Sequence, residues 1–504
     1  MNDSNERHLA TDHLLIDLKG RTISSGFITT AAQGVQFILT LGSTMVLARL
    51  LAPTDFGILA MVTAIMGFLK MFTDAGLSTA TIQRTEVTNA QVSNLFWINA
   101  SLSGLSSLIM AACAPAVAWF YHEPRLVGAT LVLSISFLLT GLAVQHMALL
   151  NRQMRFKAIA LIQVGSQVAG VVVGIGMAWL RFGYWSLVGS QVAMPLAALL
   201  FTWSASRWRP QLPTRRTGMR PMLAFGANLT AASFVFSLAA GMDNLLIGRV
   251  YGAGPVGLYS RAGALLRRPF EQFISPVSMV LVPVLSRLQD QLERYRRTFL
   301  GVYEAVVMIG SLFMGLCLAL AHPLTLVLLG ERWEKAAVIF AGFTIAAPFY
   351  PPVTMCGWLL ESQGRGGDFL RMSLIISGVS ICSFIAGLPF GPVGVAFAWS
   401  GTCILISLPI IYHIVGRSGS ISTADLWRGL LRQLPVWGVV CGATFLTKTM
   451  VTDRSPLIQL LVCAPVGLLA GAAFIGLYAP SRRTALSLLD ALRELRQGRK
   501  ASAI

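Results

Sequence analysis

Charged residues are scarce in this chain, and acidic residues are the scarcest of them. Only 12% of the 504 residues are charged, with 21 Asp and Glu against 39 Lys and Arg, while 55% are hydrophobic. Soluble domains carry roughly 25% charged residues, so the composition excludes an ordinary soluble enzyme. A net charge of +18 would suggest nucleic acid binding in a soluble protein. Here the basic residues lie in short connections between apolar runs, and we expect no nucleic acid partner.

Several chemical motifs are also missing. The seven cysteines stand singly in apolar stretches, without a CxxC pair or a Cys/His spacing, and predict neither a metal site nor a disulfide. There is no GxxxxGK[ST] signature, so ATP is not expected to drive a cycle directly. We expect no cofactor, and the sequence does not identify a coupling ion. The first residues, 1–21, lack the basic start and short apolar core of a signal peptide.

Long apolar runs are what the chain has in abundance. About fourteen runs follow one another from Gly26 to Leu477, each near the ~20 residues that a helix needs to cross ~30 Å of hydrocarbon. Lys and Arg concentrate in every second connection, on the side that also holds both termini. The positive-inside rule makes that side the cytoplasm, where basic loops also contact anionic membrane lipid. We therefore predict an all-α, multi-pass protein of the cell inner membrane with both termini in the cytoplasm.

The runs divide into two lobes of six and a final pair. The outward connections are short and leave no room for an extracytoplasmic domain. We predict a cytoplasmic tail over 1–21, an N-lobe over 22–205, a basic linker over 206–221, a C-lobe over 222–415 that begins with a span at 223–248, two further spans within 429–478, and a basic cytoplasmic tail over 479–504.

The two lobes carry an internal repeat. A shift of 200 positions pairs Arg49 with Arg249 and Gly57 with Gly257, and each copy places the Arg at the outer end of a span before a Pro/Gly turn. Six spans separate the copies, and an even number gives both lobes the same orientation. Such a parallel repeat is typical of transporters that rock two bundles about a central site.

Several stretches carry a resemblance to a known family, among them Ala48-Arg-Leu-Leu-Ala-Pro-Thr-Asp-Phe-Gly-Ile-Leu-Ala60, Leu149-Leu-Asn-Arg-Gln-Met-Arg-Phe-Lys157, Asp243-Asn-Leu-Leu-Ile-Gly-Arg249 and Val282-Pro-Val-Leu-Ser-Arg287. They resemble bacterial polysaccharide exporters of the multidrug/oligosaccharidyl-lipid/polysaccharide superfamily. The similarity covers roughly 20–415 and is specific for Wzx-type flippases, including those that are like colanic acid exporters.

The resemblance implies a V-shaped, alternating-access transporter rather than an enzyme. Its implied substrate is a polyprenyl-pyrophosphate-linked oligosaccharide repeat unit, moved between leaflets during exopolysaccharide, capsule or O-antigen biosynthesis. The pathway's polymerase and glycosyltransferases are candidate partners. Two other functions stay open. A drug or cation antiporter of the same superfamily would need a net acidic cavity, and a membrane glycosyltransferase or polymerase would need a carboxylate base or a large outer loop.

Ionisable residues inside the apolar runs are the candidate site, because each costs at least ~2.5–3.5 kcal/mol at the centre of the bilayer. Lys70 and Asp74 stand four residues apart on one face of the second span. They predict either a mutually neutralising pair near the cytoplasmic end or a cavity wall where a substrate phosphate or a proton competes for the pair.

The eighth span carries Arg261, Arg267, Arg268 and Glu271. Helical spacing places Arg261 and Arg268 on one face and pairs Arg267 with Glu271 on the next, so positive charge is in surplus. Guanidinium binds phosphate through two parallel hydrogen bonds, which suits a pyrophosphate headgroup in a central cavity. The alternative is that Arg267 and Arg268 only flank a helix kink at Pro269 that is open to cytoplasmic water.

Three further residues complete the predicted site. Arg49 and Arg249 are repeat mates at the outer ends of the first and seventh spans, where they either face one another in the cavity or extend to the membrane surface. Asp243 lies deeper in the seventh span and is a candidate partner for Arg261.

Overall fold

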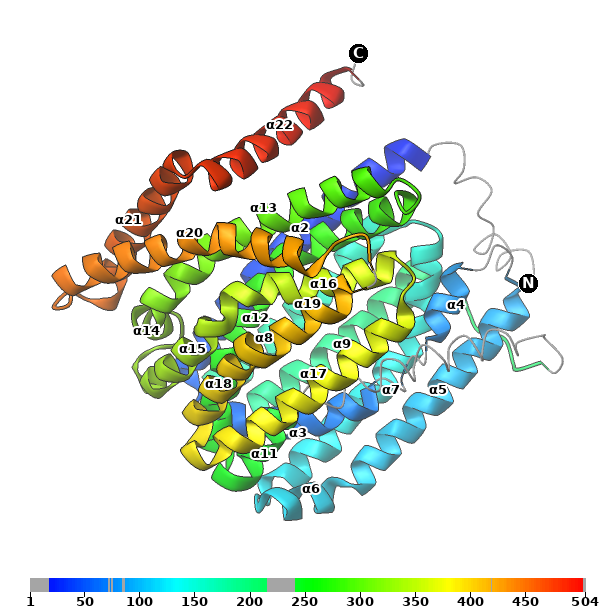
Figure 1. Ribbon diagram of the computed structural model, residues 1–504. Coiled ribbons are helices and arrows are strands. Elements are labelled where there is room, and N and C mark those ends of the chain that lie inside the picture. Colours follow the sequence, from blue (N-terminus) through cyan, green and yellow to red (C-terminus); the bar gives the residue numbers. More distant parts are fainter. Residues whose placement is uncertain are drawn as a thin grey trace. The chain divides into compact units, whose positions relative to one another are not determined.

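A computed structural model describes residues 18–70, 73, 76–83, 87–214, 241–417 and 419–501 (Figure 1). Every regular element in these ranges is helical, so the predicted all-α class is confirmed. The chain divides into two compact units, Met1–Ser260 and Arg261–Ile504. The lobe boundaries at 205 and 222 stay a prediction, because residues 215–240 are not among those described.

The first unit is a bundle in which α8 packs on α9 and α2, and α7 packs on α5 and α9. The short helix α11 packs against α3. Its described helices are α2 (Leu18–Leu50), α3 (Pro53–Lys70), α4 (Leu77–Gln83), α5 (Asn89–Ala112), α6 (Ala114–Tyr121), α7 (Arg125–Arg152), α8 (Phe156–Trp179), α9 (Trp185–Ser206), α11 (Met242–Tyr251) and the start of α12 (Ala253–Arg287).

In the second unit α13 packs on α20, α20 on α21, and α18 on both α15 and α17. Short 3-10 turns precede α15, α16 and α18, and a π-helical segment, Cys403–Ser407, joins α18 to α19. After the remainder of α12, its helices are α13 (Leu292–Ala319), α14 (Ala321–Leu329), α15 (Glu334–Ala346), α16 (Tyr350–Ser362), α17 (Gly366–Gly387), α18 (Gly391–Thr402), α19 (Leu408–Gly416), α20 (Thr423–Met450), α21 (Pro456–Leu477) and α22 (Ala479–Ala501).

The described residues contain 11 helices long and apolar enough to cross a membrane, or up to 12 if the bent α12 is one span. One of these, Gly366–Gly416, is 51 residues long. It folds back on itself, because Gly391 turns the chain at φ +74° and α17 then packs on α18. The predicted seventh span, 223–248, lies mostly outside the described residues, so the count of about fourteen stays a prediction.

The surfaces of these helices are apolar where a soluble protein would be polar. Leu161 on α8 is 74% exposed and Leu469 on α21 is 69% exposed. Exposed apolar area of this kind is favourable only in contact with lipid or a partner. Small residues set the helix packing instead: a Cβ on Gly170 or Gly174 would contact Ser190 of α9, so these glycines let α8 and α9 approach closely.

A matching arginine contact recurs in each unit. The turn after α7 holds Met154 at φ +52°, and the turn after α16 holds Gly364 at φ +67°. In both turns the next residue is an arginine whose N–H closes a Schellman-type bond, Arg155 to the Leu150 carbonyl at 3.0 Å and Arg365 to the Leu360 carbonyl at 2.9 Å.

Each of these arginines also reaches the carboxyl end of a third helix. The Arg155 guanidinium donates to the Ala205 carbonyl near the end of α9 at 2.9 Å. The Arg365 guanidinium donates to the Ile414 and Val415 carbonyls near the end of α19, both at 3.0 Å. We call these two contacts the arginine clasps. They satisfy carbonyls that a helix end leaves unpaired, and they place a positive charge at the negative end of the helix dipole.

Replacing Arg365 by alanine is expected to lower the apparent Tm of the purified protein by several degrees. The change removes hydrogen bonds from a charged group to two carbonyls, each worth about 1.5–3 kcal/mol net. Arg371→Ala, at an exposed position on the neighbouring turn of α17, is the matched control and should leave the Tm unchanged. Equal losses for both variants would show that the clasp does not stabilise the fold.

The two copies of the repeat meet at their Pro/Gly turns, inside the first unit. A Cβ on Gly57 would overlap the carbonyl oxygen of Ala253, and a Cβ on Gly257 would overlap the carbonyl oxygen of Pro53. The contact is therefore reciprocal: each glycine admits the backbone of the first helical residue of the other copy. We call it the glycine crossing. It explains in physical terms why both copies carry glycine at this position.

Candidate functional site

A cavity of about 290 Å³ lies within the first unit, between α3, α7 and α9. Most of its polar lining is neutral, with four hydroxyl residues and one amide. Lys70, at the carboxyl end of α3, is the charged residue of the described lining, and we call this space the Lys70 cavity. The polar residues are Thr63, Thr73, Ser136, Thr140 and Gln191, and apolar side chains such as Met66, Phe137 and Met194 complete the wall.

The hydroxyl groups of this cavity are held by backbone carbonyls. Thr63 donates to the Leu59 carbonyl at 2.9 Å, and Thr140 donates to the Ser136 carbonyl at 2.7 Å. A hydroxyl that donates to its own helix keeps lone pairs for a donor on a ligand. The cavity thus combines oriented acceptors, apolar surface and one cation, which suits a polyhydroxylated ligand with negative charge.

Lys70 is exposed, and the described residues contain no ion pair that involves it. Its predicted partner Asp74 lies outside the described residues. The i,i+4 pair therefore stays a prediction, whereas the position of Lys70 on a cavity wall is a structural fact.

The four charged residues predicted in the eighth span all lie on α12, in the second unit. Arg261 is half-buried, and Arg267, Arg268 and Glu271 are exposed. Arg267 also lines a small pocket with Phe270 and Tyr350. The two rings pack edge to face, with their centroids 5.1 Å apart. The residues thus lie on two adjoining faces of one helix, as their spacing predicted.

Two details of α12 differ from the sequence prediction. Among the described residues no ion pair joins Arg267 to Glu271. An acid four residues after a base is the weaker order on a helix, and both side chains are exposed. The helix bends by 43° between Gln272 and Ile274, not at Pro269. Pro276 explains the bend, since proline removes the bond to the carbonyl four residues earlier, which is that of Gln272.

Arg49 and Arg249 occupy equivalent places in the repeat. Each follows a buried pair, Leu47–Ala48 or Ile247–Gly248, and each is exposed near the end of its helix. Their partners differ, because the Arg49 guanidinium donates to the Met45 carbonyl at 3.2 Å while that of Arg249 lies 5.7 Å from the Phe120 ring centroid. Asp243 lies in the first turn of α11 and accepts the Asn244 N–H at 2.7 Å.

Comparison with known proteins now places the chain in a family. Residues 46–338 match the family model described as "Polysaccharide biosynthesis protein". The chain belongs to this polysaccharide biosynthesis protein family. The match includes the glycine crossing, the Lys70 cavity, the α12 arginines and the first clasp, so family membership rests on the part of the chain that holds the predicted site.

Individual relatives extend the similarity over most of the chain. The lipopolysaccharide biosynthesis protein WzxC of Escherichia coli (strain K12) is 24% identical over 429 residues, which cover 83% of this chain and 87% of WzxC. The succinoglycan biosynthesis transport protein ExoT of Rhizobium meliloti (strain 1021) is 25% identical over 400 residues, or 79% of this chain and 78% of ExoT.

Solved structures share the fold. A structure of the lipid II flippase MurJ, in an inward closed conformation, matches 90% of this chain and 98% of MurJ with a TM-score of 0.71 at 16% identity. An inward-facing multidrug resistance MATE transporter of the MOP superfamily matches 78% of this chain and 96% of its own, with a TM-score of 0.60 at 12% identity. This chain therefore has a fold that flippases and drug transporters share.

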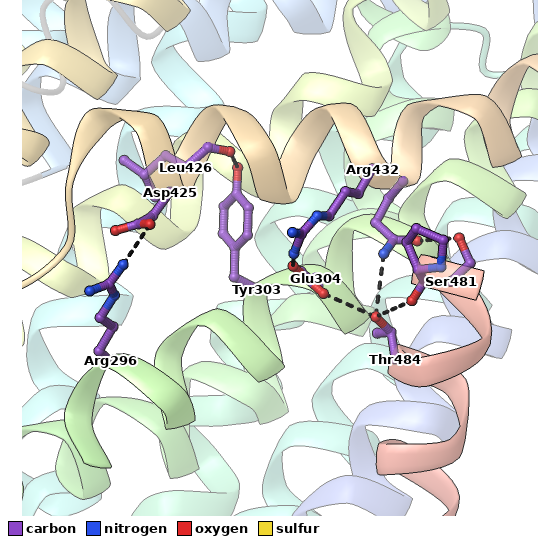
Figure 2. Close-up of polar contacts among 10 residues, drawn as sticks. Arg296, Tyr303, Glu304, Asp425, Leu426, Arg432, Ser481 and Thr484 are labelled. Atoms are coloured by element: carbon purple, nitrogen blue, oxygen red, sulfur yellow. Dashed lines mark hydrogen bonds and ion pairs between the residues drawn. The ribbon is translucent and has the colours of Figure 1, made fainter. Parts of the chain in front are cut away.

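The sequence prediction missed one polar cluster in this family member. Figure 2 shows Glu304 of α13 between Arg432 of α20, at 3.2 Å, and Thr484 of α22, whose hydroxyl donates at 3.1 Å. Ser481 of α22 donates to Gln433 of α20 at 2.8 Å. The partners of Glu304 are distant in sequence, and no local spacing reveals them.

Proposed function

We propose that this chain flips a polyprenyl-pyrophosphate-linked oligosaccharide repeat unit from the inner to the outer leaflet of the cytoplasmic membrane, with both of its termini in the cytoplasm. The observation that supports it best is the Lys70 cavity, a polar and cationic space walled by apolar membrane-crossing helices. Sugar hydroxyls would bond the Thr and Ser oxygens, while the polyprenyl chain stays in lipid. No covalent bond changes, so the chain acts as a transporter and not as an enzyme.

Each group of charged residues has its own role in the proposed transport. Arg261, Arg267 and Arg268 bind the pyrophosphate, because guanidinium keeps its charge in low dielectric and matches two phosphate oxygens at once. Arg49 and Arg249 hold the outer ends of the path, while the acidic residues Asp74, Asp243 and Glu271 compete with phosphate for the cations or carry coupling protons. The names of WzxC, ExoT and MurJ support this substrate class.

A cation or drug antiporter is the competing candidate, since MATE transporters share the fold. A site for organic cations needs a surplus of negative charge, whereas the described charge of the cavity lining is the ammonium of Lys70. The sign of the charge therefore favours an anionic headgroup.

Lys70→Gln is expected to slow flipping of a labelled polyprenyl-pyrophosphate oligosaccharide in proteoliposomes by at least about tenfold at subsaturating substrate. Losing one charge-assisted bond of about 1.5–3 kcal/mol accounts for that factor. Lys70→Arg should retain most activity, because it keeps the positive charge. Lys335→Gln, at an exposed position on α15, controls for the loss of one charge. Normal flipping by the Lys70→Gln protein would contradict the assignment, and uptake of organic cations instead of the glycolipid would favour the antiporter.

A further inference from the structure

The carboxyl-terminal helix α22 begins directly beside a membrane-crossing helix. One residue, Tyr478, separates it from α21, and an extended backbone there (ψ 109°) breaks the helix and redirects the chain, as the bend in Figure 1 shows. A membrane span at α21 therefore places the first turn of α22 in the layer of lipid headgroups.

Buried polar contacts fix the rotation of α22 about its axis. Ser481 is fully buried and donates to Gln433 at 2.8 Å, and Thr484 is 5% exposed and donates to Glu304 at 3.1 Å (Figure 2). These contacts turn one face of the helix toward α13 and α20. The opposite face points away from the protein.

The outward face mixes positive charge with large apolar side chains. Arg482 is exposed, as are Leu486 (52%) and Leu489 (50%), and the three positions follow helical spacing along one stripe. The same spacing continues through Arg493, Arg496 and Lys500. We call this set the outer stripe of α22.

The outer stripe needs a partner that accepts both leucine side chains and guanidinium groups. Leucine side chains that are half exposed to water are unfavourable. A helix with basic and apolar residues on one surface is typical of helices that lie in the membrane interface. Asp490 is exposed at the edge of the stripe, four residues after Leu486 and three before Arg493, and Glu494 lies farther round the helix. The four basic residues of the stripe outnumber this acid, so its net charge is complementary to the phosphate of anionic lipid.

We propose that α22 lies along the membrane surface and binds anionic phospholipid headgroups through the outer stripe. The leucines insert among the acyl chains nearest the headgroups, and the arginines bond lipid phosphates. The inference does not depend on which substrate the transporter carries.

Hydrogen–deuterium exchange of the full-length protein in nanodiscs tests this proposal. Amides of residues 486–500 should exchange at least about tenfold more slowly in discs with phosphatidylglycerol than in discs of phosphatidylcholine alone, since each basic residue gains about a factor of five at an anionic surface. The variant Arg482→Gln/Arg493→Gln/Arg496→Gln/Lys500→Gln should lose this difference. Residues 479–484, which the polar contacts hold, should exchange alike in both proteins and show that the variant is folded.

Matched variants separate lipid binding by the stripe from a general effect of charge on the helix. Arg483→Gln/Arg499→Gln removes charge from the same helix but off the stripe, and should keep most of the lipid dependence. Leu486→Ser/Leu489→Ser should speed exchange in both kinds of disc, because insertion of leucine does not require lipid charge. Equal exchange in both lipids, or an equal loss in the off-stripe control, would overturn the proposal. Protection that appears only when another protein is added would also overturn it and would identify the stripe as a protein-binding surface.

Discussion

Replacing Arg261 and Arg268 together by glutamine is expected to abolish polysaccharide export while the protein inserts at normal abundance. Glutamine keeps a hydrogen-bond donor on a shorter side chain and removes the charge. Two charge-assisted bonds to pyrophosphate are worth about 3–6 kcal/mol in total, which corresponds to at least a hundredfold loss of affinity. Surface polysaccharide and inner-leaflet lipid-linked oligosaccharide are the measurements, and the second should accumulate as the first disappears.

The chemistry of the replacement distinguishes binding from mere charge. Lysine at both positions should rescue export only in part, because an ammonium lacks the paired geometry of guanidinium. Arg287→Gln, an exposed position at the end of the same helix, is the control and should export normally. If export and the lipid-linked intermediates are unchanged in the double glutamine protein, Arg261 and Arg268 are not a phosphate site and the α12 arginines only face solvent.

Replacing Gly57 by alanine is expected to lower the amount of folded protein strongly, although it adds a single methyl group. The new Cβ would overlap the Ala253 carbonyl, which is backbone and has no other rotamer to adopt. Overpacking costs typically 1–3 kcal/mol and more where the backbone must move, so the abundance and apparent Tm should both fall. Gly257→Ala should behave alike, since its Cβ would overlap the Pro53 carbonyl.

The reciprocal geometry of the glycine crossing also predicts the stability of the double variant. Separating the two helices once relieves both overlaps, so Gly57→Ala/Gly257→Ala should cost clearly less than the sum of the single changes. Gly42→Ala is the matched control: a Cβ there meets nothing within 4 Å, and alanine gains up to about 1 kcal/mol over glycine in a helix. Additive losses, or single variants as stable as the control, would contradict the crossing.

Features with a local period were predictable from the sequence. Apolar length predicted the spans, helical spacing placed Arg261 and Arg268 together, and the pairing of Gly57 with Gly257 identified the copies of the repeat. The arginine clasps were not predicted. Arg155 and Arg365 are 210 positions apart, so the shift of 200 that aligns the first helices does not align these two arginines.

Other features depend on choices that sequence leaves open. α12 has three prolines, Pro269, Pro276 and Pro283. Each removes one helical hydrogen bond, so the sequence alone does not show at which of them the helix bends. No ion pair joins Arg267 to Glu271 among the described residues, and helical spacing alone could not settle this because an acid four residues after a base is the less favourable order. Glu304 gained its partners from helices more than a hundred positions away.

The glycine crossing also bears on the ancestry of the chain. Residue 57 meets residue 253 while residue 257 meets residue 53, the exchange of partners that defines an isologous contact in a symmetric homodimer. One polypeptide thus retains the type of interface that two identical half-length copies would form, as expected after gene duplication and fusion. Fusion then allowed the halves to diverge: Lys70 corresponds to Phe270, and Arg261 corresponds to Met61. A homodimer must present every charge twice, whereas a fused chain can match a substrate that has no symmetry of its own.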